Sequence, residues 1–213
     1  MSNEIEIITY RGREIKTYHD DNPIDDEPWN WYESGYLIYD HRDCQIAPRD
    51  KKPSFANVIN QLWIESKDDT TEIDGEFYFV FPVFAYIHGD VVLYLSEQKA
   101  RRYEPTGFDI SMKGFVVIKQ CEEFHYKDVA LEEAHRIVKS YNMMLAGEIY
   151  GYQSDFGSCW GYWGRDGYKQ MIAEAKDEID GELHYLMKKR LESLKNYIKN
   201  KVPIIYRKLP EVA

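Results

Sequence analysis

The chain has 213 residues, with 27 Lys and Arg against 37 Asp and Glu, so its formal net charge is −10 at neutral pH. Hydrophobic residues make up 44% and aromatic residues 15% of the sequence. This excludes a disordered chain, because disordered chains lack the apolar surface that offsets the entropy of ordering. The negative balance disfavours direct binding to nucleic acid, whose phosphates would repel the chain.

The sequence predicts a cytoplasmic protein that does not cross a membrane. The longest apolar stretch, residues 77–87, is shorter than the ~20 residues of a membrane-spanning helix and contains Pro82. The first residues have neither the basic nor the apolar region of a secretion signal. Cys44, Cys121 and Cys159 are odd in number and form no CxxC pair, which favours reduced thiols over a disulfide framework.

Several segments are predicted to be strands because they are short and rich in Tyr, Phe, Val and Ile, or alternate apolar with polar residues. They are residues 4–10, 36–39, 76–87, 91–96, 115–119, 148–153 and 158–163. Two pairs can form hairpins, one around His88-Gly89-Asp90 and one around residues 154–157. Residues 19–31, 67–75 and 99–113 are predicted to be loops or turns.

Two medium-length helices are predicted from apolar residues at helical spacing. The first covers residues 54–66, with Ser54 as a favourable N-cap. The second covers 128–146, begins at Asp128 and stops at Gly147.

The clearest predicted element is a long helix over 167–200, which has no proline and carries one apolar stripe. Acidic residues crowd its first half and basic residues its second, which suits the helix dipole. The same polarity suits antiparallel pairing, in which the acidic half of one copy faces the basic half of another. Two alternatives stay open: the helix packs on its own chain with solvated charges, or it forms a homodimer.

Together these elements predict an α+β fold, in which an antiparallel, aromatic-rich sheet carries two packed helices and a long C-terminal helix. Residues 1–166 are expected to form the α+β domain. Residues 167–200 form the long helix, packed on that domain or used for dimerisation, and residues 201–213 form a C-terminal tail.

Three residues are the first candidates for a catalytic site. His41 follows a predicted strand, His88 is at the tip of a hairpin, and Cys159 lies in a glycine- and tryptophan-rich segment. If they converge, a thiolate–imidazole pair can act as a nucleophile, and His, Asp and Cys side chains can bind zinc. HxH, HExxH and paired CxxC spacings are absent from the sequence, so no metal and no cofactor is predicted. The alternative is that these side chains make surface hydrogen bonds only.

An acidic segment and an aromatic segment are candidates for partner binding. The acidic residues are Asp20, Asp21, Asp25, Asp26 and Glu27. They lack the order of an EF-hand loop, but they can imitate a row of phosphates and occupy a basic groove. Trp160 and Trp163 alternate with glycines and are typical interface anchors. The alternatives are a solvated loop and ordinary hairpin packing.

Several stretches, taken in order, resemble a family of small, largely uncharacterised proteins encoded by bacterial phages and other mobile elements. The matching pieces are residues 31–35 with 37, 41 and 42, then 82–89, 107–109, 114–117, 145–151 and 158–164. They span about Asp20 to Gly164. Residues 108–114 lack the serine-glycine-glutamine that the family carries before a valine-glycine pair, and the helix after Tyr168 is not part of the resemblance.

The resemblance implies a mobile-element origin and an intracellular accessory role, and it supplies no catalytic residue. It points to six positions to test: His41, Arg42, His88, Asp109, Cys159 and Trp160. We expect a protein that binds and inhibits a host defence or nucleic-acid-processing complex with a basic surface, by acidic and aromatic contacts. One alternative is a small enzyme whose site gathers His41, His88, Asp109 and Cys159, with or without zinc, acting on a nucleotide or protein. Another is a structural dimer inside a larger particle.

Overall fold

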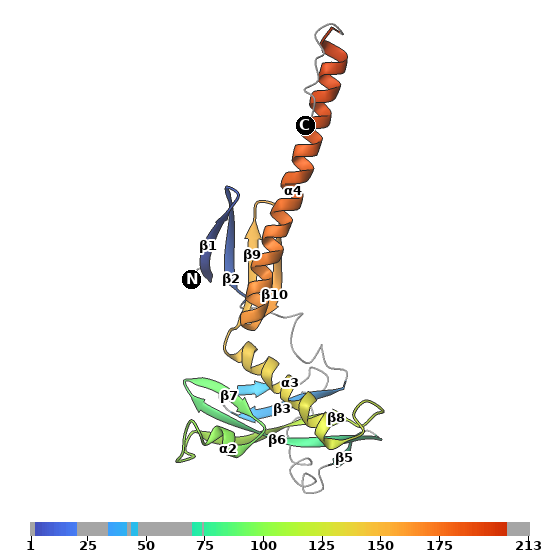
Figure 1. Cartoon of the computed structure of the whole chain (residues 1–213). Helices are drawn as coiled ribbons and strands as arrows, with labels where there is room; N and C mark the ends of the chain where they lie inside the picture. The colour runs from blue at the N-terminus through green and yellow to red at the C-terminus, as the bar shows by residue number, and fades with distance from the viewer. Residues whose placement is uncertain (1–2, 21–33, 42–43, 47–69, 74, 204–213) are drawn as a thin grey trace.

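The structure is a computed structural model that describes residues 3–20, 34–41, 44–46, 70–73 and 75–203. Its strands form two antiparallel sheets, a small sheet of four strands and a large sheet of six (Figure 1). The predicted α+β class and long C-terminal helix are confirmed, but the strands are divided between two sheets where one was expected. The helix predicted at 54–66 and most of the acidic segment lie outside the described residues.

The small sheet joins the two ends of the described chain. Its order is β1 (Glu4–Tyr10), β2 (Arg13–His19), β9 (Ile149–Ser154) and β10 (Ser158–Trp163). Strand β2 pairs with β9, with Ile15 opposite Ser154. The sequence did not predict β2, because Ile15 and Thr17 are its only fully buried side chains and the partner strand is far away in sequence.

The large sheet is organised around a long central strand. Its order is β4 (Cys44–Ile46), β3 (Gly35–His41), β8 (Ile110–Lys119), β6 (Glu76–His88) and β5 (Thr70–Ile73), and β7 (Asp90–Tyr94) also pairs with β6. Strand β6 binds β8 on one side, and on the other it binds β5 near its start and β7 near its end.

Two of the predicted loops are partly wrong. The expected turn at 67–75 contains β5, which forms because the first part of β6 offers it an open edge. The expected loop at 99–113 contains the end of the short helix α2 (Glu97–Ala100) and the start of β8. Both elements depend on pairing or packing with distant residues, which local composition does not reveal.

Helix α3 (Lys127–Leu145) covers one face of the large sheet and closes the main core. Leu37, Phe81 and Val116 of the sheet meet Ile137 and Tyr141 of the helix, all at most 5% exposed. A second, smaller cluster of buried side chains in the large sheet is separate from this core. It consists of Val80, Phe115 and Val117.

The ends of α3 follow local rules, with one correction. The N-cap is Tyr126, and Asp128 lies in the first turn, where its carboxylate still favours the helix dipole. The predicted stop at Gly147 is confirmed: its φ is +67°, and the N–H groups of Gly147 and Glu148 donate to the carbonyls of Met144 and Met143. This pattern is the Schellman motif, in which glycine adopts the left-handed conformation at little cost.

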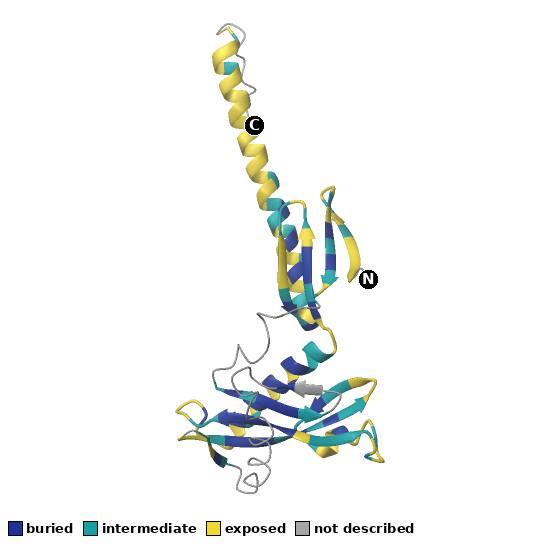
Figure 2. Cartoon of the chain, turned by 180° about the vertical axis from the view of Figure 1, so that it is seen from behind, coloured by how far each residue is buried: buried dark blue, intermediate teal, exposed yellow. Residues whose placement is uncertain are grey.

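Helix α4 (Gly164–Lys201) has 38 residues and is about 57 Å long at 1.5 Å per residue. Its inner half, residues 164–183, packs on β9 and β10 and buries Met171, Ala175 and Ile179 completely. Leu183 is the last α4 residue in the small sheet's apolar cluster. The outer half, residues 184–201, projects away from both sheets and is almost entirely exposed (Figures 1 and 2). Among the described helices, none has a segment long and apolar enough to cross a membrane.

Candidate functional site

Two of the candidate residues meet at the end of the large sheet. His88 closes the β6–β7 hairpin, and its Nδ1 lies 3.0 Å from Oδ2 of Asp109. The backbone N–H of Ile87 also donates to the Asp109 carbonyl at 2.9 Å, which fixes the loop before β8 against the hairpin. The side chains of His88 and Asp109 are 72% and 37% exposed. Asp109 therefore orients the His88 imidazole, and solvent reaches both side chains.

His41 lies apart from this pair. Tyr39 and Val83 both pair with Gly114, on the two sides of β8. His41 is two residues beyond Tyr39, whereas His88 is five beyond Val83. At about 4.8 Å between strands and 3.3 Å per residue, the two Cα atoms are roughly 14 Å apart.

Cys159 belongs to the small sheet, on β10, and its thiol is exposed. His41 and His88 belong to the large sheet, and Asp109 directly precedes its strand β8. The four candidates are therefore divided between the parts of the chain that contain the two sheets, which lie apart (Figure 1). Within the described residues, no group of three or more His, Cys, Asp and Glu side chains is placed to hold a metal ion.

Trp160 lies flat on β9, opposite a glycine. A Cβ built on Gly151 would be 2.2 Å from Cε3 of Trp160, so only glycine leaves room for the indole. The Tyr18 ring centroid is 5.8 Å from that of Trp160, and Trp160 is 47% exposed. The two rings form a surface aromatic pair, whereas Trp163 is half-buried at the N-cap of α4.

Of the acidic segment, the structure describes only Asp20. Its backbone N–H donates to the carbonyl of Ile149 at 2.8 Å, just past the end of β2. Residues 21–27 lie outside the described residues, so their predicted role stays a prediction.

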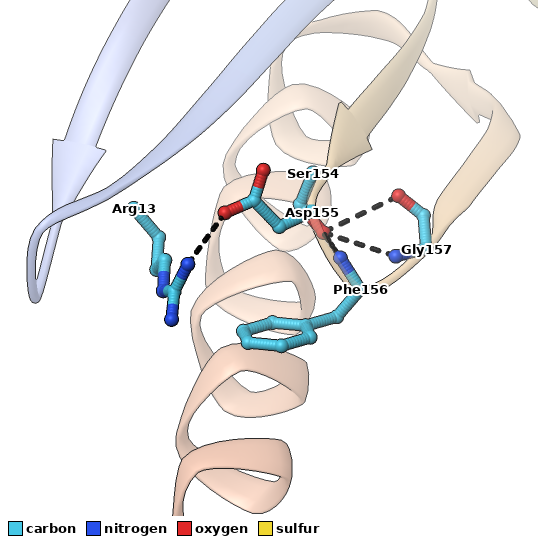
Figure 3. A network of polar contacts seen from close by, with 5 residues as sticks. All are labelled: Arg13, Ser154, Asp155, Phe156 and Gly157. Carbon is cyan, nitrogen blue, oxygen red and sulfur yellow. Dashed lines mark hydrogen bonds and ion pairs between the residues drawn. The ribbon is translucent and has the colours of Figure 1, made fainter.

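The β9–β10 turn that leads into α4 is held by polar contacts. Oγ of Ser154 accepts hydrogen bonds from the N–H groups of Phe156 at 3.1 Å and Gly157 at 3.2 Å (Figure 3). Arg13 of β2 binds Asp155 at 2.9 Å, and its guanidinium lies 5.3 Å from the centroid of the Phe156 ring. The turn thus fastens the N-terminal hairpin to the hairpin that precedes α4.

Tyrosine hydroxyls of the small sheet bind carboxylates along the inner half of α4. The pairs are Tyr162 with Glu174, Tyr152 with Glu178, and Tyr10 with Asp180. Burial, with the nearby Glu178 carboxylate, raises the pKa of Tyr152 to about 12. Burial also raises the pKa of Tyr162. These contacts hold the inner half on the sheet and thereby set the direction of the outer half.

A groove of about 690 Å³ lies between β7, α3 and the start of α4. Apolar side chains such as Val138 and Trp163 share its lining with the cations Lys99, Lys139 and Arg165. Burial and the nearby Lys99 charge lower the pKa of His135, another lining residue. Glu148 and Asp166 also line the groove, so its lining carries charges of both signs. Sequence reasoning missed it because α2, α3 and α4 each contribute one cation, and no spacing links the three.

One side chain in this groove closes the open edge of β7. The N–H of Leu93 donates to Oδ1 of Asn142 at 2.7 Å, and Nδ2 of Asn142 donates to the Leu93 carbonyl at 2.9 Å. The amide of Asn142 therefore takes the place of a neighbouring strand at this residue. Such covering of an edge prevents another strand from pairing there.

The outer half of α4 exposes a row of large apolar side chains. Met187, Leu191 and Leu194 are 70%, 53% and 51% exposed, and Ile198 continues the row. They extend the stripe whose inner members are buried on the small sheet.

Comparison with protein-family models, curated proteins and solved structures gives no match to this chain. The resemblance to mobile-element proteins stays a prediction that rests on the residues quoted for it.

Proposed function

We propose that this chain is a binding protein of phage or mobile-element origin that holds, and thereby inhibits, a host protein complex of defence or nucleic-acid processing. The observation that carries the proposal is the outer half of α4, which projects from the fold with Met187, Leu191 and Leu194 exposed in a row. A helix with a row of exposed apolar side chains is typical of a docking element, because water contact with that surface is unfavourable.

The positions of the catalytic candidates also favour binding over catalysis. His88 and Asp109 form an exposed pair, but Cys159, the proposed nucleophile, lies in the other sheet. Nucleophilic catalysis needs the nucleophile within hydrogen-bond reach of its base, and the described residues do not assemble such a pair from these candidates.

Outside the outer half of α4, the charge of the chain supports contact with a second, basic surface of the partner complex. The net charge is −10 even though the outer half of α4 is itself basic, so acidic groups dominate the remainder. Opposite charge across an interface accelerates association and weakens as salt rises. Exposed Trp160 is a suitable aromatic anchor within such an interface.

The test is capture of a host complex followed by an activity assay. Full-length tagged chain is incubated with nuclease-treated bacterial host lysate at low and moderate salt, and captured proteins are identified by mass spectrometry. We expect one stoichiometric complex whose capture falls as salt rises, and whose purified activity is lost when the chain is added in equimolar amount. Replacing Asp20, Asp21, Asp25 and Asp26 with Lys should weaken the capture.

A matched variant separates binding from catalysis. His88→Ala should leave capture and inhibition unchanged if the protein acts by contact. Loss of inhibition with capture intact would contradict the proposal and support the enzyme, whereas a chain that captures no complex would overturn binding as its function.

A further inference from the structure

We propose that the outer half of α4, residues 184–201, docks an acidic amphipathic helix of the partner protein. This inference rests on the proposed function and deepens it by giving the chemistry of one contact.

Three exposed residues and the half-buried Ile198 have the spacing of a coiled-coil seam. Met187, Leu191, Leu194 and Ile198 follow one another in steps of four, three and four residues. This alternation brings apolar side chains to one line of the helix and lets each insert between side chains of a facing helix. Tyr185, Leu186 and Tyr197 are exposed on this half as well. Tyr185 and Leu186 lie off the seam and Tyr197 lies at its edge, so the seam itself is a line that matches a single helical partner.

The seam points away from the small sheet. Met171, Ala175, Ile179 and Leu183 are four residues apart, and the series continues to Met187 and Leu191. Each step of four residues rotates the stripe by about 40° around the helix axis. The outer seam is therefore turned roughly a third of a revolution from the face buried on the sheet, so a partner helix can lie along it without meeting the sheet.

The charges beside the seam select an acidic partner. The outer half contains six Lys and Arg against one Glu, although the chain as a whole is acidic. Lys188 and Lys195 flank the seam on one side and Arg190 on the other, at the positions that face the partner's flanking residues in a coiled coil. Glu or Asp at those partner positions would form ion pairs, whereas Lys or Arg would be repelled.

The same charges disfavour a second copy of this chain. Pairing two outer halves would set these cations against one another in either orientation. Antiparallel pairing along the whole of α4 would bring basic residues against acidic ones, but it would need the inner stripe, and Met171, Ala175 and Ile179 are fully buried in the chain's own fold.

An anionic lipid surface fits the outer half less well than a helix does. Helices that lie on membranes bury a wide apolar face in which Trp, Phe and Leu are typical. Residues 184–201 contain neither Trp nor Phe, and Arg190 borders the seam directly.

The test uses the full chain and two designed peptides as probes. Both peptides have three heptads with Leu at the seam positions; the acidic probe has Glu, and the basic probe Lys, at every flanking position. Fluorescence anisotropy measures their binding at neutral pH. We expect micromolar binding of the acidic probe, at least tenfold weaker binding of the basic probe, and roughly fivefold weakening of the acidic complex at high salt.

Three variants locate the contact. Leu191→Ala with Leu194→Ala keeps good helix formers and should weaken acidic-probe binding at least tenfold. The control pair Ser193→Ala and Asn196→Ala, outside the seam, should leave binding unchanged. Reversal of Lys188, Arg190 and Lys195 to Glu should switch the preference to the basic probe. Circular dichroism checks that each variant keeps the helix.

Other outcomes would overturn the inference. Equal binding of both probes would show that the charges beside the seam do not select an acidic partner. Dimerisation of the full chain at micromolar concentration, abolished by the Leu191 and Leu194 substitutions, would assign the seam to a second copy. Binding to vesicles rich in anionic lipid but to neither probe would assign it to a membrane surface. The probes involve no host protein, so failure here leaves the host-capture experiment as a separate test of the proposed function.

Discussion

Asn142 is expected to stabilise the fold by closing the edge of β7. Replacing it with Ala removes both hydrogen bonds to Leu93, which measure 2.7 and 2.9 Å. A buried backbone group left without a partner costs about 1–3 kcal/mol. Asn142 lines the groove beside β7, so water can reach part of the exposed edge, and the lower end of that range applies to each group. We expect a loss of about 2 kcal/mol in the free energy of unfolding.

Urea unfolding measures this loss, and hydrogen exchange measures the Leu93 amide directly. Exchange at Leu93 should accelerate in Asn142→Ala, while the β6–β8 amides change only through global unfolding. Asn142→Asp should also destabilise, because it keeps the acceptor but cannot donate to the Leu93 carbonyl. Glu132→Ala, an exposed change on the same helix, should stay within about 0.5 kcal/mol. Unchanged stability and unchanged Leu93 exchange would show that Asn142 does not close the β7 edge.

Three further predictions concern the small sheet and α4. Gly181→Ala should raise the free energy of unfolding by up to about 1 kcal/mol in urea, since an added Cβ meets nothing within 4 Å; a loss would contradict this. Gly151→Ala should cost about 1–3 kcal/mol, because its Cβ would displace the Trp160 ring; a neutral result would show that the ring does not lie there. The Tyr152 pKa is raised from 10.0 to about 12, so the folded state holds this proton more tightly than the unfolded state. Its contribution to stability is complete below pH 10 and is lost as the pH rises toward 12, and Tyr152→Phe should reduce that loss in urea unfolding measured across this range.

Local sequence patterns predicted the elements that depend on interactions between residues close together in the chain. The β6–β7 hairpin was predicted from the Phe-, Tyr- and Val-rich run of β6 and from the His88-Gly89-Asp90 turn. The end of α3 was predicted from Gly147. The long helix α4 was predicted because its apolar residues recur in steps of three and four, a pattern that is visible without knowing what the helix packs against.

Long-range pairing decided what the sequence did not reveal. Strand β2 is held by β9, with Ile15 opposite Ser154, and this contact divides the strands between two sheets. Among site residues, His88 and Asp109 meet as the enzyme alternative requires, but Cys159 does not join them because its strand belongs to the small sheet. The groove beside β7 was missed because its charged residues, among them Lys99, Lys139 and Arg165, converge only in the folded chain.

The sequence alone could not show which part of the apolar stripe of α4 is buried and which part is exposed. Ile179 and Leu191 occupy the same apolar series, yet Ile179 is fully buried and Leu191 is 53% exposed. The small sheet ends between them, and only the fold shows where. That boundary turns a long amphipathic helix into an anchored inner half and a projecting outer half.

Hydrogen exchange along α4, in the free chain and in the complex captured from host lysate, shows whether the partner binds the outer half of α4. We expect fast exchange over residues 184–201 in the free chain, where the helix lies beyond the small sheet, and marked slowing of the same amides in the complex. The inner half should exchange slowly in both states. Residues 184–201 that exchange equally fast in free chain and complex, while other segments become protected, would show that the partner binds elsewhere.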